Sequence, residues 1–187
     1  MRSKPLLAMA LVGTIILLQG LYIPAKALLA QSLLNHAWLQ TKQGKVAAKP
    51  WPWADTYPLA KLMIPKLNKD FIVLKGSTGA TLAFAPGHLT GTAMPDEDGH
   101  IVLSAHRDTH FSRLGEMHVG DMLQLETQTG EIRKFIIQET LIINSQVDSL
   151  WVDHSRNHLT LITCYPFDAI QAGGPLRFRI DAIAYSD

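Results

Sequence analysis

From Leu59 to Tyr185 the sequence alternates between short apolar runs and turn residues, and this pattern constrains the fold more than any other feature. Glycine, proline, asparagine and aspartate separate the runs, as they do between β-strands. Many short strands at this spacing predict an all-β barrel or sandwich. The strands are expected near residues 71–75, 81–84, 101–105, 122–127, 131–143, 158–164 and 176–185.

An uncharged apolar stretch from Pro5 to Ile23 precedes this region, with Arg2 and Lys4 in front of it. At about 1.5 Å per residue it is roughly 28 Å long, which is close to the hydrocarbon thickness of a bilayer. The basic residues favour a cytoplasmic N-terminus and place the rest of the chain outside the cytoplasm. A cleaved signal peptide is the alternative, with residues 25–27 as its cleavage site, but the stretch exceeds the usual core of about 7 to 15 residues. We therefore predict an uncleaved transmembrane anchor.

The segment after the anchor combines a helical pattern with a linker. Leu29, Leu33 and Trp38 follow helical spacing. They predict an amphipathic helix that packs on the main domain, in preference to one lying on the membrane surface. The prolines of residues 49–53 predict an extended linker, whose two tryptophans suit either the membrane interface or packing on the domain. The predicted segments are therefore the anchor over 1–27, the membrane-proximal helix and linker over 28–58, and the main domain over 59–187.

Cys164 is the only cysteine of the chain, and it ends the apolar run 158–164. Alternation places it on one face of a strand, at the last position before a loop. Outside the cytoplasm a single cysteine cannot form an internal disulfide, so its thiol stays available. A lone cysteine is commonly a buried apolar residue, but a position beside a loop favours a nucleophile.

His106 follows the apolar run 101–105 in the same way that Cys164 ends its own run. A nearby imidazole can hold a thiolate as an ion pair and protonate the amine that leaves when a peptide bond is attacked. The other seven histidines are interpreted as surface or structural residues. These properties make His106 the candidate partner of the thiol.

Two arginines compete for a third role in the site. Arg177 and Arg179 share one face of the expected strand 176–185, and alternation alone does not choose between them. Arg177 lies nearer the loop, whereas Arg179 is about 7 Å deeper if the strand pairs antiparallel with the cysteine strand. A fixed guanidinium near the thiol would stabilise the oxyanion of a tetrahedral intermediate.

Charge and ligand patterns argue against other classes of partner. The net charge is +1 and only 18% of residues are charged, so no nucleic acid is expected. A metal protein using His106, Asp108, His110 and Cys164 is disfavoured, because strand positions four apart lie about 13 Å apart. The acidic residues 96–98 are interpreted as a solvated turn in preference to a calcium site. We therefore predict no metal and no cofactor.

The run Thr160-Leu161-Ile162-Thr163-Cys164 resembles the TLxTC signature of sortases, which are membrane-anchored cysteine transpeptidases. Ala105-His106-Arg107-Asp108 resembles their histidine motif, and Arg177 lies where the family places its arginine. The resemblance covers residues 59–185, and residues 164–167 and 173–177 are most similar to the proteobacterial class GN or marine sortases. Ala105 departs from the commoner sortases, which have glycine before the histidine.

The resemblance implies a closed eight-stranded β-barrel with short helices and a two-step acyl transfer. Cys164 would attack an LPxTG-like C-terminal sorting signal of a protein substrate and form a thioester. His106 would protonate the leaving amine and then assist an incoming amine acceptor, while Arg177 would hold the oxyanion or the substrate backbone. The flanking residues expected to bind substrate are Ala105, Arg107, Thr163 and Tyr165.

The expected location is the bacterial inner membrane, crossed once, with the catalytic domain on the periplasmic side. A cysteine peptidase, in which water replaces the amine, stays open as an alternative. A membrane-tethered binding module without catalysis is another, and it predicts a thiol at position 164 that does not react with thiol probes.

Overall fold

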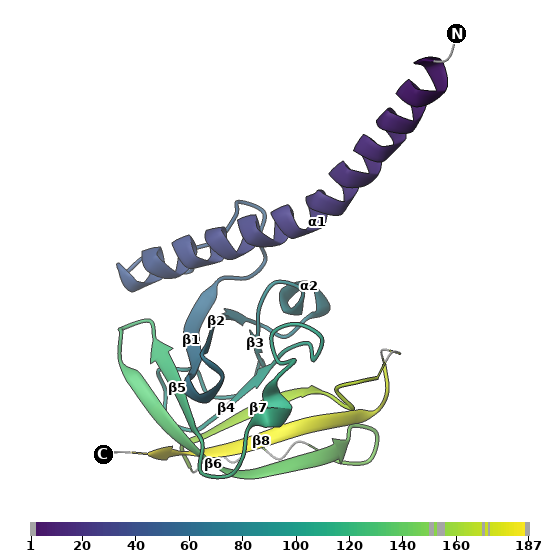
Figure 1. The fold of residues 1–187 in the computed structure, drawn as a ribbon. Helices are drawn as coiled ribbons and strands as arrows, with labels where there is room; N and C mark the ends of the chain where they lie inside the picture. The colour runs from purple at the N-terminus through teal and green to yellow at the C-terminus, as the bar shows by residue number, and fades with distance from the viewer. Residues whose placement is uncertain (1–2, 150–151, 153–155, 170, 172, 186–187) are drawn as a thin grey trace.

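The computed structural model describes residues 3–149, 152, 156–169, 171 and 173–185, and its eight strands close into a single barrel (Figure 1). Around the barrel the strands follow the order β1-β2-β3-β4-β7-β8-β6-β5. This closed barrel confirms the predicted fold class. The strands are β1 (Pro58–Ile64), β2 (Lys69–Lys75), β3 (Gly87–His88), β4 (His100–Ser104), β5 (Met122–Thr127), β6 (Ile132–Asn144), β7 (His158–Cys164) and β8 (Leu176–Tyr185).

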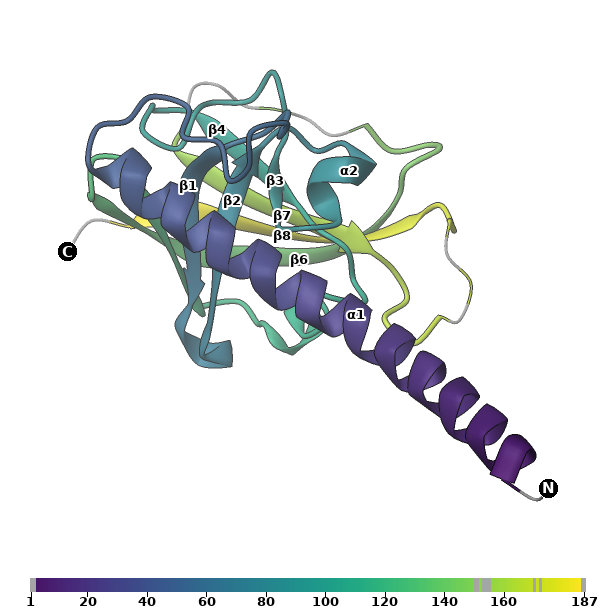
Figure 2. The same ribbon diagram turned by 90° about the horizontal axis from the view of Figure 1, so that it is seen from above.

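A single long helix, α1 (Ser3–Lys42), contains both the predicted anchor and the predicted amphipathic helix. Its N-terminal part projects away from the barrel, and its C-terminal part lies across it, as the two views show (Figures 1 and 2). Pro24 lies inside the helix. Within the described residues, α1 is the one helix long and apolar enough to cross a membrane, between Leu11 and Lys42.

The C-terminal part of α1 is fixed to the barrel by apolar contacts. Leu34 and Trp38 are buried against Ile72 and Leu74 of β2. Side-chain contacts of this kind confirm a packing helix, because burial of an apolar stripe stabilises a helix on a domain.

The structure corrects the strand prediction at one segment and extends it at two others. Residues 81–84 do not form a strand, because α2 (Gly79–Leu82) begins here. Thr78 caps this helix by accepting a hydrogen bond from the Thr81 amide, and such caps favour a helical start. The strands β1 and β3 were not expected. Two short 3-10 turns complete the elements, η1 (Pro65–Leu67) and η2 (Leu114–Glu116).

The barrel interior is closed by large apolar side chains. Leu62, Leu103, Leu123 and Phe135 are fully buried in one cluster, together with Leu161 of β7. On β7, Leu159 and Leu161 therefore point into this core and the residue between them points to the opposite face, since successive strand side chains alternate. Cys164 lies at the end of β7 and is only half-buried.

Candidate active site

Two parallel strands, β4 and β7, end side by side and carry the chain toward the histidine and the cysteine. Their last pair joins Ser104 and Ile162. His106 lies two residues after Ser104, just beyond the end of β4, and Cys164 lies two residues after Ile162, as the last residue of β7. Beyond the last pair, the amide of Ala105 still donates to the carbonyl oxygen of Ile162 over 3.2 Å.

Strand register separates the two candidate arginines. In the antiparallel ladder between β7 and β8, Arg177 lies directly opposite Cys164, whereas Arg179 lies opposite Ile162. Directly opposite residues project from the same face with their Cβ atoms about 5 Å apart. The Nε atom of Arg179 is bound to the Oδ2 atom of Asp181 at 2.7 Å. Arg177 is therefore the arginine at the level of the thiol.

The guanidinium of Arg177 lies at the mouth of the loop between β7 and β8. Its Nη1 atom donates to the carbonyl oxygens of Gly174, at 2.6 Å, and Leu176, at 2.8 Å. The side chain is half-buried. A guanidinium held in this way keeps its other donors for groups that approach the end of β7.

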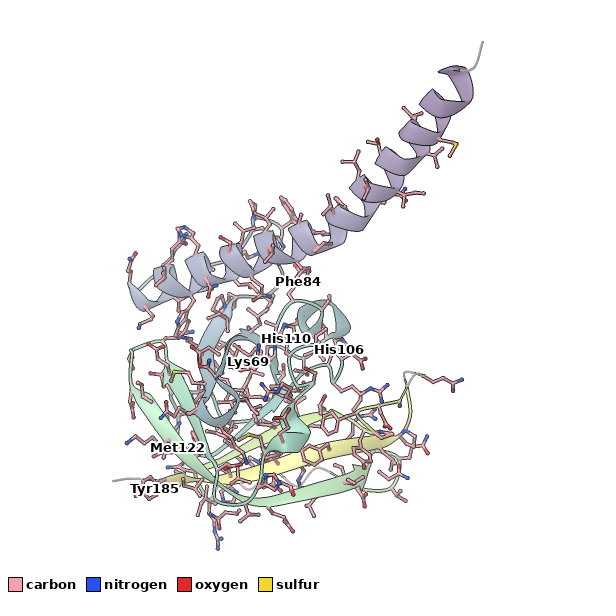
Figure 3. The ribbon with its side chains drawn as sticks, in the orientation of Figure 1. Lys69, Phe84, His106, His110, Met122 and Tyr185 are labelled. Carbon is pink, nitrogen blue, oxygen red and sulfur yellow. The ribbon has the colours of Figure 1, made fainter. Side chains whose placement is uncertain are left out.

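The thiol and the imidazole of the candidate site are both accessible. Cys164 is a free, half-buried cysteine, so it is not sealed inside the hydrophobic core. His106 is exposed on the loop that follows β4. Figure 3 shows His106 and His110 on this same loop, and His110 lies close to Phe84.

His110 borders the site as a second imidazole. Its ring packs edge-on against Phe71, with ring centroids 5.8 Å apart. Burial lowers the pKa of His110, and the charge of His106 lowers it further, although a hydrogen bond with the backbone of Phe84 acts in the opposite direction. The neutral ring is therefore favoured at position 110.

The four flanking residues predicted to bind substrate take different positions. Thr163 and Ala105 are buried, and the Thr163 hydroxyl donates to the Ala105 carbonyl over 2.8 Å. Arg107 is also buried and donates to backbone carbonyls of the loop after Cys164. Tyr165 is half-buried at the start of that loop. The polar side chains of Thr163 and Arg107 thus bond within the protein, and nothing in their sequence pattern signalled this.

The metal-binding alternatives receive no support from the geometry. Across the described residues, no group of three or more histidine, cysteine, aspartate or glutamate side chains is placed to hold a metal ion. In the acidic turn 96–98, the Asp98 carboxylate instead accepts from Asn157 at 2.8 Å and from Arg133 at 3.3 Å. Arg133 thus supplies a positive partner for the Asp98 carboxylate, and Asn157 adds a neutral donor.

Comparisons with known proteins agree with this architecture. Residues 62–182 match the family model described as the Sortase domain. A curated relative, Sortase D of Bacillus subtilis (strain 168), is 36% identical over 119 residues. This match covers 64% of the present chain and 60% of the relative, so the chain spans less than two thirds of the relative's length.

Several solved structures share the fold. A sortase D transpeptidase of Clostridium perfringens is 26% identical with a TM-score of 0.61, over 70% of this chain and 80% of that one. Sortase C-1 of Actinomyces oris is 25% identical with a TM-score of 0.61, over 70% and 74% of the two chains. Sortase A of Corynebacterium diphtheriae, a lid mutant, has a TM-score of 0.63 at 23% identity, over 84% and 94%, and it supports the fold alone.

Proposed function

Because the chain belongs to the sortase family, we propose that it is a membrane-anchored cysteine transpeptidase with Cys164 as its nucleophile. Its substrate is a protein with an LPxTG-like C-terminal sorting signal. The enzyme cleaves this signal through a thioester and transfers the acyl group to an amine acceptor. The observation that carries the proposal is the register of β7 and β8, which sets Arg177 opposite the half-exposed Cys164.

The first half of the reaction uses all three candidate catalytic residues. The sulfur of Cys164 gives its proton to His106 and attacks the carbonyl carbon of the substrate threonine, and the guanidinium of Arg177 stabilises the oxyanion of the tetrahedral intermediate. When the carbon–nitrogen bond breaks, His106 gives a proton to the leaving amine. The products are a thioester on Cys164 and a free amine fragment.

The second half reverses these roles with a new amine. The incoming amine attacks the thioester carbon and His106 takes its proton. When the carbon–sulfur bond breaks and the new amide forms, His106 returns this proton to the sulfur, which leaves as the thiol. Water in place of the amine would give hydrolysis. A half-exposed thiol suits this exchange, because the acceptor must reach the thioester after the first product has left.

The long helix α1 supports a location at the membrane. Its apolar N-terminal part lies outside the barrel, with Met9, Leu17 and Leu21 exposed. Such side chains are favourable in lipid and unfavourable in water. We therefore propose that α1 anchors the enzyme in the bacterial inner membrane with the barrel on the periplasmic side, where sorting signals of exported proteins are accessible.

The test is product analysis with the full chain in detergent micelles. A library of LPxTG-like peptides is incubated with and without added amines, and cleaved and joined products are identified by mass spectrometry. The proposal expects joined products that depend on the amine and that disappear in Cys164→Ala. Cleavage alone, unaffected by any amine, would instead identify a cysteine peptidase, and full activity of Cys164→Ala would exclude both.

A further inference from the structure

Arg107 has an unusual environment for an arginine that follows an exposed histidine. Its side chain is only 6% exposed. The guanidinium donates to three backbone carbonyls of the loop between β7 and β8: Nη1 to Pro166 at 2.7 Å, and Nη2 to Ala169 at 2.8 Å and Gln171 at 3.0 Å. One side chain from the histidine segment therefore holds the loop that begins directly after Cys164.

The charge of Arg107 is balanced mainly by these carbonyl dipoles. Among the residues that the structure describes, the carboxylate paired with it belongs to the neighbouring residue, Asp108, at 3.1 Å from the Nε atom, and that side chain is 66% exposed. A planar guanidinium presents donors in several fixed directions, which suits carbonyls at separate points of a loop. The ammonium of a lysine is a single point charge and cannot reproduce this arrangement.

The bonds of Arg107 have a counterpart on the other side of the histidine. Thr163, the residue before Cys164, donates to Ala105, the residue before His106. Arg107, the residue after His106, donates to Pro166, in the loop after Cys164. The chain on each side of the imidazole is thus bonded to the chain on each side of the sulfur.

A third bond completes the fixation of the histidine segment. The carbonyl oxygen of His106 accepts from the amide of Phe111 at 3.1 Å. The far end of the loop is bound independently, because Arg177 donates to Gly174 and Leu176. Loss of the Arg107 bonds would therefore free the front of the loop and the backbone at His106 together, while leaving the Arg177 end bound.

We propose that Arg107 is a positioning residue, which sets the distance and angle between the His106 imidazole and the Cys164 sulfur by holding the loop after the cysteine. Arg107 acts through His106 and through the loop, and its buried guanidinium does not bind substrate. Its effect on turnover rests on the proposed transpeptidase function, whereas its effect on thiol reactivity does not. A misplacement of reacting groups by about 1 Å can cost about a hundredfold in rate, so the expected loss appears in kcat.

The experiment compares Arg107→Lys with Arg133→Lys in the full chain. Arg133 is a matched control because it is 12% exposed and also donates to two backbone carbonyls, Pro95 at 3.0 Å and Glu97 at 2.5 Å. Arg133 lies in β6, and the two carbonyls belong to the loop between β3 and β4. Alkylation of Cys164 by iodoacetamide is followed by mass spectrometry from about pH 5 to 9, and Cys164 is the only thiol that can react.

Three results are expected from this comparison. Arg107→Lys changes the pH profile of alkylation toward that of His106→Ala, whereas Arg133→Lys keeps the wild-type profile even where it lowers the melting temperature. In the His106→Ala background, adding Arg107→Lys changes the profile no further, as required for a residue that acts through His106. With a sorting peptide, Arg107→Lys lowers kcat by about tenfold or more and leaves KM within about twofold.

Other outcomes would overturn the proposal. One such outcome is that Arg107→Lys has the wild-type pH profile of alkylation. Another is that Arg107→Lys changes this profile equally in the wild-type protein and in His106→Ala. Either result would leave Arg107 a purely structural residue. If Arg107→Lys does not fold, hydrogen exchange of the unmodified chain decides the matter: the segments 106–111 and 165–169 should open with the same free energy, and independent opening contradicts the proposal. Wild-type protein inactive with every peptide would refute the transpeptidase, while the alkylation profiles would still test Arg107.

Discussion

The hydroxyl of Thr163 donates a hydrogen bond of 2.8 Å to the carbonyl oxygen of Ala105, and so joins the strand that ends in Cys164 to the strand that leads to His106. Both residues are buried, Thr163 at 2% and Ala105 at 5% exposure. Water therefore cannot replace the bond if the hydroxyl is removed. The neighbouring backbone bond from Ala105 to Ile162 is longer, at 3.2 Å. Alignment of the segments that carry His106 and Cys164 thus depends strongly on this side chain.

We expect Thr163→Val to lower both stability and turnover. The substitution keeps the shape of the side chain but leaves the Ala105 carbonyl without its partner, at a cost of about 1–3 kcal/mol. The melting temperature should fall by a few degrees for each kcal/mol. Turnover of a sorting peptide should fall by about tenfold or more, because the histidine and cysteine segments lose their alignment. Calorimetry and steady-state kinetics measure the two effects.

Thr160→Val provides a matched control on the same strand. Thr160 is fully buried, and its hydroxyl donates to the Oδ1 atom of Asp181 at 2.6 Å. The same substitution should therefore lower stability, but it lies away from the strand end and should leave turnover per folded molecule near the wild-type value. Equal losses of turnover in both variants would show that Thr163 has no special part in alignment.

Arg177→Lys should reduce turnover by about a hundredfold or more, the usual effect of losing one oxyanion donor. Lysine keeps the charge but loses the planar fork that reaches both the loop carbonyls and an approaching substrate. Arg179→Lys is the control, since Arg179 lies opposite Ile162 and pairs with Asp181. It should change turnover by no more than about twofold, as expected away from the site. A larger loss in Arg179→Lys than in Arg177→Lys would reverse the assignment of the two arginines.

Proximity to the loop and the resemblance to sortases favoured Arg177, but the alternation of the strand did not separate it from Arg179. Alternation placed Arg177 and Arg179 on one face, but the choice between them depends on strand register. That register is set by the length and conformation of the loop between β7 and β8. The alternation of apolar and polar residues within a strand does not predict it. The run that delivers Cys164, in contrast, was predicted with its observed bounds, His158–Cys164. Its apolar alternation is a local property of the sequence.

Two other features of the fold depend on contacts that are distant in the sequence. The strand β3 has only two residues, and it exists because Gly87 pairs with both Leu74 and Ser104. The burial of Arg107 likewise depends on carbonyls about sixty positions further along the chain. A hydrophobic pattern predicts neither kind of contact, because the partners are backbone groups whose positions follow from the completed fold.

Gly115→Ala should disturb the active-site loop through a steric contact. A Cβ atom at position 115 would lie 2.8 Å from the Cε2 atom of Phe167, which belongs to the loop after Cys164. Phe167 also packs against Phe178 of β8, with ring centroids 5.3 Å apart. Overpacking of this kind typically costs about 1–3 kcal/mol, and we expect turnover to fall together with the melting temperature.

Gly79→Ala is the appropriate comparison for this substitution. Position 79 lies in α2, and no atom is within 4 Å of the Cβ that alanine would add. Alanine there should stabilise the protein by about 0.4–1 kcal/mol by restricting the unfolded chain, and it should leave activity unchanged. If Gly115→Ala likewise kept full stability and activity, the prediction would be wrong. Phe167 could then move aside without affecting Cys164.

His110 should make the protein less stable as the pH falls below about 6.5. Burial against Phe71 lowers the pKa of His110 in the folded chain, and the charge of His106 adds to this effect. The unfolded chain takes up its proton near the ordinary value of 6.5. Between that value and the lowered folded pKa, the unfolded state binds more protons than the folded state. Stability therefore increases with pH through this window and is lost on acidification.

The variant His110→Gln tests this dependence, because glutamine keeps a polar side chain but does not titrate. Unfolding by urea at a series of pH values between about 5 and 8 gives the free energy of unfolding at each pH. In the wild type this free energy should fall with acidification below about pH 6.5, and in His110→Gln the fall should be smaller over the same range. An identical slope in the two proteins would assign the acid sensitivity to another group. Since His110 lies beside His106, any loss of turnover in the variant must be judged against its stability at the same pH.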